Sequence, residues 1–269
     1  MARFRLFPGA TVRPAVQPVD RRGHITLVMP TFNEAGRVGG VIARLPPFVL
    51  GLRTTCIVID DGSTDDTVAE ALSAGAKVVR HESNMGLGAA IRTGLRVAVD
   101  DGSEIVAFCD GDGEYAPEEL DRLVAPILEG NADYVVGSRF AGTIRRMSPH
   151  RRLGNIVLTR WVRWMTRRPL TDGQSGYRAL SRAAAIDAEV IHDYNYAQVL
   201  TLDLLAKGYA YAEVPISYEF RSDGASFVRL GSYLRRVVPA TMREIRAQSS
   251  ATAQSSTAAQ SSTTQSSTT

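Results

Sequence analysis

Short apolar runs alternate with amphipathic stretches along most of the chain, and polar or glycine-rich turns separate them. Apolar runs of roughly four to eight residues are typical of buried strands, whereas the stretches between them have helical periodicity. The predicted elements are strand 25–29, helix 34–45, strand 54–59, helix 65–73, strand 77–80, helix 88–99, strand 104–109, helix 117–128 and strand 133–137. Repeated units of this kind predict an α/β fold with a mainly parallel central sheet and helices on both faces.

The second half of the chain departs from this regular alternation. Its predicted elements are helix 149–168, a loop and short strand over 172–180, helix 196–207, strand 212–218 and a final amphipathic helix over 227–246. Ligands of parallel α/β sheets bind at the carboxyl ends of the strands. We therefore expect the second half to complete the sheet and to build the acceptor side of a cleft at that edge.

The two ends of the chain lack the apolar content of a folded core. Residues 1–23 are basic and interrupted by prolines, which predicts a flexible arm, and residues 248–269 repeat uncharged Gln, Ser and Thr, which predicts a disordered tail. A single folded domain is predicted over 24–247. The 44% hydrophobic and 22% charged content is ordinary for a soluble globular protein, and the net charge of +3 does not imply a nucleic acid.

Two features bear on the compartment. Cys56 and Cys109 fall inside apolar runs and are expected to be reduced core thiols, so we expect a cytoplasmic location. The sequence contains no run of about 18 apolar residues, so no membrane-spanning helix is predicted.

An acidic loop follows the apolar run 105–109. Asp110, Asp112 and Glu114 alternate with glycines, and alternate residues of an extended segment share one face. Three carboxylates on one face suit Mg²⁺ or Mn²⁺ held partly by a phosphate-bearing substrate. The alternative is an acidic surface turn. An EF-hand does not fit, because no glutamate closes a twelve-residue loop.

Two further polar segments are expected at the same edge of the sheet. Residues 30–34 follow the first predicted strand, and the acidic segment 60–65 follows the second. Ser63 or Thr64 suits a helix N-cap. A cap does not account for two acids at the strand end, so the sequence favours a ligand role for them, as acceptors for a nucleobase or ribose.

In this order and spacing, the motifs resemble the inverting family 2 glycosyltransferases of GT-A fold (nucleotide-diphospho-sugar transferase fold), and among them the dolichyl- and polyprenyl-phosphate mannosyl- and glucosyltransferases. The resemblance extends from Ile25 to Tyr233. Besides the three loops, it rests on Asn84-x-Gly86-x-Gly88, Gly137-Ser138-Arg139, Asp172-x-x-Ser175-Gly176-Tyr177-Arg178 and Glu213-Val214-Pro215-Ile216. It implies a GDP- or UDP-sugar donor, a polyprenyl phosphate acceptor, and Mg²⁺ or Mn²⁺ as cofactor.

The resemblance also implies roles for individual residues. Asp110 and Asp112 are implied to contact the ribose and the metal-diphosphate, and Glu114 stands where these enzymes often have a glutamine third metal contact. Arg139 and Arg178 match family arginines that face phosphates, a task suited to the guanidinium fork. The implied donor-binding residues are Pro30, Thr31, Asn33, Glu34, Asp60, Asp61, Gly88, Asp110, Gly111, Asp112 and Arg221.

The predicted helix 149–168 lies in a strongly basic stretch. From Arg139 to Arg168 there are nine arginines and no acidic residue. The helix combines an apolar, tryptophan-bearing stripe with a cationic one. Two interpretations remain open: a core-packed helix with a solvated basic face, and a helix at the anionic inner face of the cell membrane that presents a polyprenyl phosphate. No nucleic-acid partner is expected, because no motif for one accompanies the charge.

The sequence leaves the acceptor and two rival functions open. A phosphate acceptor is already an anion, whereas a hydroxyl of a glycan or small molecule needs a base, for which Asp193 is the first candidate, with His192 beside it. A nucleotidyltransferase is disfavoured because residues 30–34 are neither glycine-rich nor basic. An inactive nucleotide-sugar-binding protein is disfavoured by the intact acidic loop.

Overall fold

The computed structural model describes residues 23–147, 149–166, 168–191 and 196–220. Residues 1–22 of the predicted arm, the predicted final helix 227–246 and the predicted tail lie outside the described residues. The domain boundaries given above therefore stay predictions.

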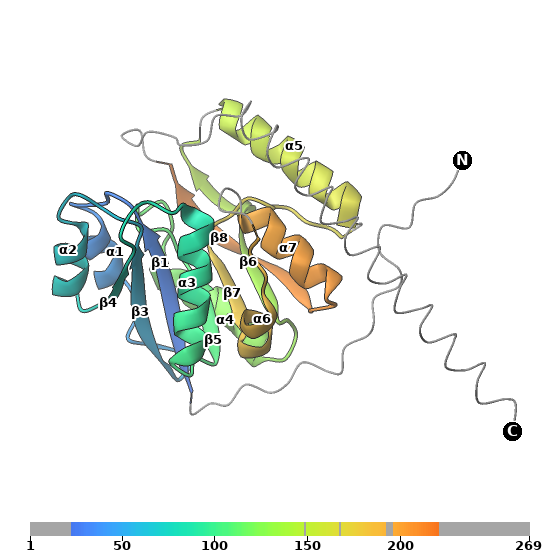
Figure 1. Cartoon of the computed structure of the whole chain (residues 1–269). Helices are drawn as coiled ribbons and strands as arrows, with labels where there is room; N and C mark the ends of the chain where they lie inside the picture. The colour runs from blue at the N-terminus through green and yellow to red at the C-terminus, as the bar shows by residue number, and fades with distance from the viewer. Residues whose placement is uncertain (1–22, 148, 167, 192–195, 221–269) are drawn as a thin grey trace, which may run out of the picture. The chain divides into compact units, whose positions relative to one another are not determined.

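One sheet organises the described residues (Figure 1). Its strands follow the order β2-β3-β1-β5-β7-β6-β8, with β4 paired to β3. Their bounds are β1 His24–Thr31, β2 Phe48–Val49, β3 Leu52–Asp60, β4 Lys77–Arg80, β5 Ile105–Phe108, β6 Tyr134–Arg145, β7 Arg178–Ser181 and β8 Tyr211–Glu219. Pairing is parallel from β4 through β3 and β1 to β5 and between β6 and β8, whereas β2 and β7 run antiparallel to their neighbours.

Helices pack on both faces of this sheet, as the sequence predicted (Figure 1). Their bounds are α1 Val38–Ala43, α2 Thr67–Ser73, α3 Leu87–Asp100, the 3₁₀ turn η1 Pro117–Glu119, α4 Leu120–Leu128, α5 Pro149–Thr166, α6 Arg182–Asp187 and α7 Tyr196–Ala206. Leu27 and Met29 face the core under α1, α2 and α4, whereas Val28 faces the core under α3, α6 and α7. This alternation follows from the two-residue period of a strand and gives the sheet two apolar faces.

The first strand is longer, and the first helix shorter, than the sequence predicted. β1 continues to Thr31, and α1 begins only at Val38. Asn33 adopts a left-handed backbone with φ 54°, and its N–H donates to Ser63 Oγ at 2.9 Å. The next N–H, of Glu34, also donates to a side chain at the start of α2. These side-chain acceptors pin the segment as a loop in place of a helical turn.

Two elements of the second half also differ from prediction. β6 continues to Arg145 because β8 pairs with it again beyond a register shift between Ser138 and Thr143. α6 was not predicted, and its N-cap is Ser181, whose Oγ accepts the N–H of Ala184 at 3.3 Å. Because β7 is antiparallel, the loop before it reaches the same sheet edge as the carboxyl ends of β5 and of the paired part of β6.

Candidate active site

The acidic loop leaves the carboxyl end of β5 and packs between the end of β1 and the loop before β7. A Cβ atom added to Gly111 would lie 2.7 Å from Thr31 Cγ2, and one added to Gly176 would lie 2.6 Å from Asp110 Oδ2. Both approaches are closer than a side chain allows. The structure therefore brings Asp110, Gly111 and Thr31 together at the sheet edge, and glycine at both positions permits the contact.

Two of the acidic side chains take on structural bonds. Asp112 Oδ1 accepts the N–H of Glu114 at 2.9 Å, which closes a short turn. Glu114 Oε2 accepts the hydroxyl of Tyr218, and the Glu114 carbonyl accepts the N–H of Glu219 at 3.0 Å. The loop is thus fastened to the end of β8.

Asp110 is the most perturbed carboxyl of the loop. Burial raises its pKa to about 8, and repulsion from Asp112 and Glu114 adds to the rise, whereas Arg139 opposes it. Carboxylates that repel one another in a sheltered site are stabilised by a cation placed among them. Within the described residues, no three His, Cys, Asp or Glu side chains are placed as a metal-binding group. Carboxylates such as Asp110, Asp112 and Glu114 are chemically suited to a divalent ion, but the structure does not assemble them as a ligand set. Their predicted metal role therefore stays a prediction.

The end of β1 contributes a polar atom that invites a ligand. In the described part of the chain, the buried Thr31 Oγ1 has no hydrogen-bond partner. An unsatisfied buried hydroxyl costs about 1–3 kcal/mol, which a ligand group at this edge would relieve. This observation supports the predicted donor-binding role of Thr31.

Asp60, the last residue of β3, and Asp61, which follows it, are almost fully buried and have protein partners. Asp60 Oδ2 lies 3.2 Å from Arg80 Nε. Asp61 accepts the N–H of Gly86 at 2.8 Å and lies 2.8 Å from His81 Nδ1. These carboxylates hold the strand end and the turn before α3 in shape, and their predicted contact with a nucleotide stays a prediction.

His81 is a residue of this region that the sequence did not single out. Its Nδ1 faces Asp61, and its Nε2 lies 3.0 Å from Thr93 Oγ1 on α3. An isolated histidine after a short strand carries no pattern in the sequence, so only the long-range contacts reveal its place.

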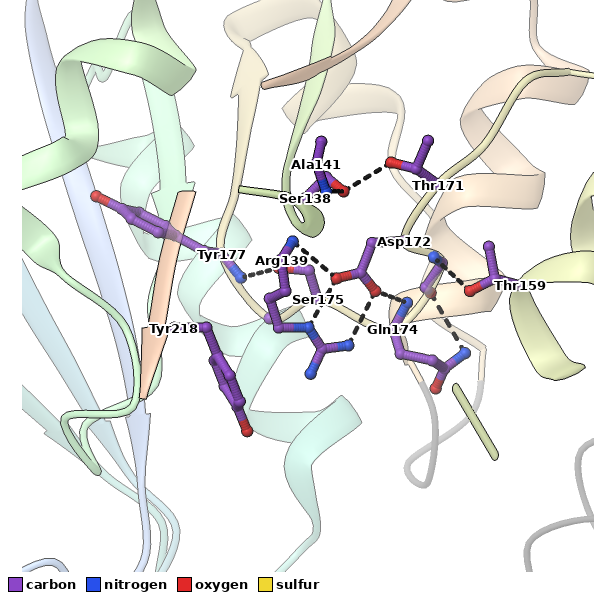
Figure 2. Close-up of polar contacts among 12 residues, drawn as sticks. Ser138, Arg139, Ala141, Thr159, Thr171, Asp172, Gln174, Ser175, Tyr177 and Tyr218 are labelled. Carbon is purple, nitrogen blue, oxygen red and sulfur yellow. Dashed lines mark hydrogen bonds and ion pairs between the residues drawn. The ribbon is translucent and has the colours of Figure 1, made fainter. Parts of the chain in front are cut away.

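Arg139, at the carboxyl end of the paired part of β6, forms a forked ion pair with Asp172 (Figure 2). Its Nε lies 2.7 Å from Asp172 Oδ2, and its Nη2 lies 2.9 Å from Oδ1. Both residues are almost fully buried. The ring of Tyr218 lies 5.1 Å from the guanidinium carbon. Arg139 is therefore fixed beside the acidic loop, and its predicted contact with a phosphate stays a prediction.

Arg178, the first residue of β7, is completely buried. Its Nε donates to the Ser175 carbonyl at 2.6 Å, its Nη2 to the Gly173 carbonyl at 3.3 Å, and its Nη1 to the Ala197 carbonyl at 2.7 Å. These bonds shape the loop before β7. Its predicted role as a phosphate contact remains untested.

The remaining predicted site residues are distributed as follows. Asn33 and Glu34 lie in the loop after β1, where Asn33 Oδ1 accepts the N–H of Thr64 at 2.9 Å. Pro30 is buried in β1, and Gly88 is buried in the first turn of α3. Asp193 and His192, together with Arg221, lie outside the described residues.

Helix α5 turns apolar side chains outward. Leu153 is 63% exposed, Val157 56% and Trp164 72%. With about 3.6 residues per turn, these three fall on one side of the helix, opposite the buried Leu158. The exposed Arg160 lies among them, so the apolar and cationic stripes overlap. Within the described residues, no helix combines the length and apolar character needed to cross a membrane.

Comparison with known proteins identifies the family. Residues 26–194 match the family model described as Glycosyl transferase family 2. The chain belongs to this family. It is therefore a glycosyltransferase, as the resemblance implied.

Two relatives carry specific names. Polyprenol monophosphomannose synthase of Mycolicibacterium smegmatis is 30% identical over 241 residues, which cover 85% of this chain and 87% of that protein. UDP-N-acetylglucosamine–dolichyl-phosphate N-acetylglucosaminyltransferase of Methanococcus voltae is 30% identical over 179 residues, 60% of this chain and 70% of that protein.

Solved structures confirm the predicted GT-A fold. Glucosyl-3-phosphoglycerate synthase from Mycobacterium tuberculosis, in complex with Mn²⁺, UDP and phosphoglyceric acid, matches with a TM-score of 0.64 and 26% identity. The match covers 83% of this chain and 78% of the synthase. The same enzyme in complex with Mg²⁺ and UDP matches with a TM-score of 0.60 and 25% identity, over 80% of this chain and 77% of the synthase.

Proposed function

We propose that this family 2 glycosyltransferase moves a sugar, with inversion, from a nucleotide-diphosphate sugar to a polyprenyl phosphate. The names of the two relatives support a lipid phosphate acceptor. The neighbouring structures with UDP and Mn²⁺ or Mg²⁺ support a nucleotide-sugar donor and a divalent cofactor. We propose a UDP- or GDP-linked sugar as the donor.

The exposed side of α5 is the observation that most directly supports the proposal of a lipid acceptor. A helix that turns tryptophan and aliphatic side chains to the outside, with arginines and no acid along its length, matches an anionic membrane surface in both polarity and charge. Each basic residue near such a surface adds about 1 kcal/mol of attraction. We infer a peripheral contact at the cytoplasmic face of the membrane, where a polyprenyl phosphate is presented.

Donor binding falls to the loops at the carboxyl ends of β1, β3 and β5. Asp110 and Asp112 would hold the divalent ion, with Glu114 as a third contact. The Thr31 hydroxyl, which has no hydrogen-bond partner among the described residues, would bind the nucleotide side. When bound, the ion neutralises charge that develops on the departing diphosphate. The raised pKa of Asp110 supports this assignment, since a cation would stabilise the charged form that burial, and then repulsion from Asp112 and Glu114, disfavours.

Acceptor activation requires little from the protein when the acceptor is a phosphate. The phosphate oxygen is already an anion, so positioning and charge stabilisation suffice. Arg139 is the candidate for this task, because it is fixed by Asp172 beside the acidic loop. Arg178 supports the loop before β7 and is a weaker candidate, since it is completely buried and all three of its guanidinium nitrogens donate to backbone carbonyls.

A second candidate function is transfer to a soluble acceptor. The neighbouring synthase holds phosphoglyceric acid, which supports an acceptor without a lipid chain. A hydroxyl acceptor would need a general base, for which Asp193 remains the predicted residue.

The experiment that separates these functions is an acceptor screen. The enzyme is supplied with UDP- and GDP-sugars and Mn²⁺ or Mg²⁺, and offered polyprenyl phosphate in anionic vesicles or phosphoglycerate in solution. Labelled sugar in the lipid fraction is the expected result. Transfer only to the soluble acceptor would reject the lipid acceptor, and binding of nucleotide sugar without transfer to either would favour an inactive binding protein.

A further inference from the structure

The end of β8 grips the acidic loop through one tyrosine. The Tyr218 hydroxyl donates to Glu114 Oε2, and the next residue's N–H donates to the Glu114 carbonyl at 3.0 Å. Tyr218 is only 4% exposed.

The ring of the same tyrosine supports Arg139. The guanidinium carbon lies 5.1 Å from the ring centroid, a distance at which a cation is attracted to an aromatic face. Figure 2 shows Arg139 between this ring and the carboxylate of Asp172. The Tyr218 ring also packs against the ring of Tyr115, with centroids 5.3 Å apart. One buried side chain therefore contacts both a carboxylate of the acidic loop and the arginine beside it.

We propose that Tyr218 is a positioning residue that aligns the two halves of the active site, its hydroxyl orienting Glu114 and its ring orienting Arg139. This inference rests on the proposed function, in which the acidic loop holds a divalent ion and Arg139 faces the acceptor. Groups that bind a metal ligand from outside fix its orientation and typically change metal affinity by about 10- to 100-fold when removed. The hydroxyl and the ring of Tyr218 act on different partners, so two substitutions separate their contributions.

The test compares Tyr218→Phe with Tyr218→Leu. Tyr218→Phe deletes the hydroxyl and keeps the ring, so we expect Mn²⁺ binding in the presence of UDP or GDP to weaken by about tenfold, with the acceptor KM unchanged. Tyr218→Leu removes the ring as well, so we expect the acceptor KM to rise in addition. Binding is measured by titration calorimetry, and Mn²⁺-dependent melting temperature gives a second readout besides activity.

Tyr209→Phe is the matched control. Tyr209 is also 4% exposed, and its hydroxyl also donates to a carboxylate, Asp187 Oδ2 at 2.5 Å. It lies just before the amino end of β8, whereas Tyr218 lies near the carboxyl end. Tyr209→Phe should therefore leave Mn²⁺ binding unchanged. If the wild type binds Mn²⁺ and Tyr218→Phe binds it equally well, the proposed role of Tyr218 is wrong while the proposed metal site stands. A wild-type protein that binds no Mn²⁺ with either nucleotide would overturn the proposed metal site and this inference together.

Discussion

Gly176 lies so close to Asp110 that a methyl group at Gly176 would come within 2.6 Å of Asp110 Oδ2. The N–H of Gly176 donates to the Tyr115 hydroxyl at 2.8 Å, which keeps the loop before β7 in this position. The carboxylate at the centre of the acidic loop is thus confined by the backbone of a segment that follows it by more than sixty residues in the sequence.

Gly176→Ala should therefore displace Asp110 without unfolding the protein, since the clashing atom is the end of a side chain. We expect kcat to fall by about tenfold or more, because misplacing a group in the site by about 1 Å is costly. The measurement is steady-state kinetics with a thermal melt. The control is Gly40→Ala on α1, where nothing lies within 4 Å of the added Cβ. Unchanged kinetics in Gly176→Ala would contradict the placement of Asp110.

The pKa of Asp110 predicts a pH-dependent stability of the metal-free protein. Its folded pKa of about 8 exceeds the ordinary aspartate pKa of 3.8, so between these values the folded chain holds a proton that the unfolded chain has lost. The contribution of this group to the free energy of unfolding therefore falls as pH rises from about 4 to about 8.

Asp110→Asn should remove this loss. Without divalent ions, we expect the variant to melt higher than wild type near pH 8.5 and at the same temperature near pH 4, as measured by calorimetry. Asp100→Asn, at the exposed end of α3, should leave the pH dependence as it is. The same difference in melting temperature between wild type and Asp110→Asn at both pH values would contradict the perturbed pKa.

Asp112→Asn tests the metal assignment directly. The amide keeps the size of the side chain and an oxygen that can still accept the N–H of Glu114, so the fold should persist. Loss of the charge should remove most Mn²⁺- or Mg²⁺-dependent turnover, about 100-fold or more by comparison with other charge-stabilising groups. Near-wild-type activity would rule out Asp112 as a metal ligand.

Glu114→Gln restores the residue that the polyprenyl-phosphate enzymes often have. The glutamine oxygen still accepts the Tyr218 hydroxyl, so activity should be retained. One negative charge fewer should change the relative rates with Mn²⁺ and Mg²⁺, which a metal titration measures. Complete loss of activity would assign the extra carboxylate a different role.

Substitutions on α5 test the membrane contact. Leu153→Glu and Trp164→Glu place charge on its exposed side, and we expect each to weaken sedimentation with anionic vesicles by about tenfold, since apolar burial and electrostatic attraction both decline. Leu72→Glu on α2, where the leucine is 56% exposed, is the control. Equal vesicle binding by all three variants and the wild type would exclude α5 as the contact surface.

The sequence predicted those parts of the fold that local pattern determines. Apolar runs located most of the strands, and the acidic loop was placed correctly at the end of β5 because strand and loop are adjacent in the chain. The predicted start of α1 was wrong because the loop before this helix is hydrogen-bonded to Ser63 and Thr67, about thirty residues away in the sequence. The partners Asp172 of Arg139 and Tyr218 of Glu114 are 33 and 104 residues distant, beyond the reach of any local pattern.

Because β7 runs antiparallel to its neighbours, the loop before it and the loops after the parallel strands meet at one edge of the sheet although they come from different parts of the sequence. The loops to which we assign the donor all follow parallel strands of the first half, whereas the loop of residues 172–177 precedes an antiparallel strand and meets them at the same edge of the sheet. Exchange of residues in that segment, with Gly176 kept for its contact with Asp110 and Asp172 kept for its pair with Arg139, would therefore alter the wall that we propose faces the acceptor. For engineering, this makes the remaining positions ahead of β7 the first to vary when a new acceptor is sought for an unchanged donor.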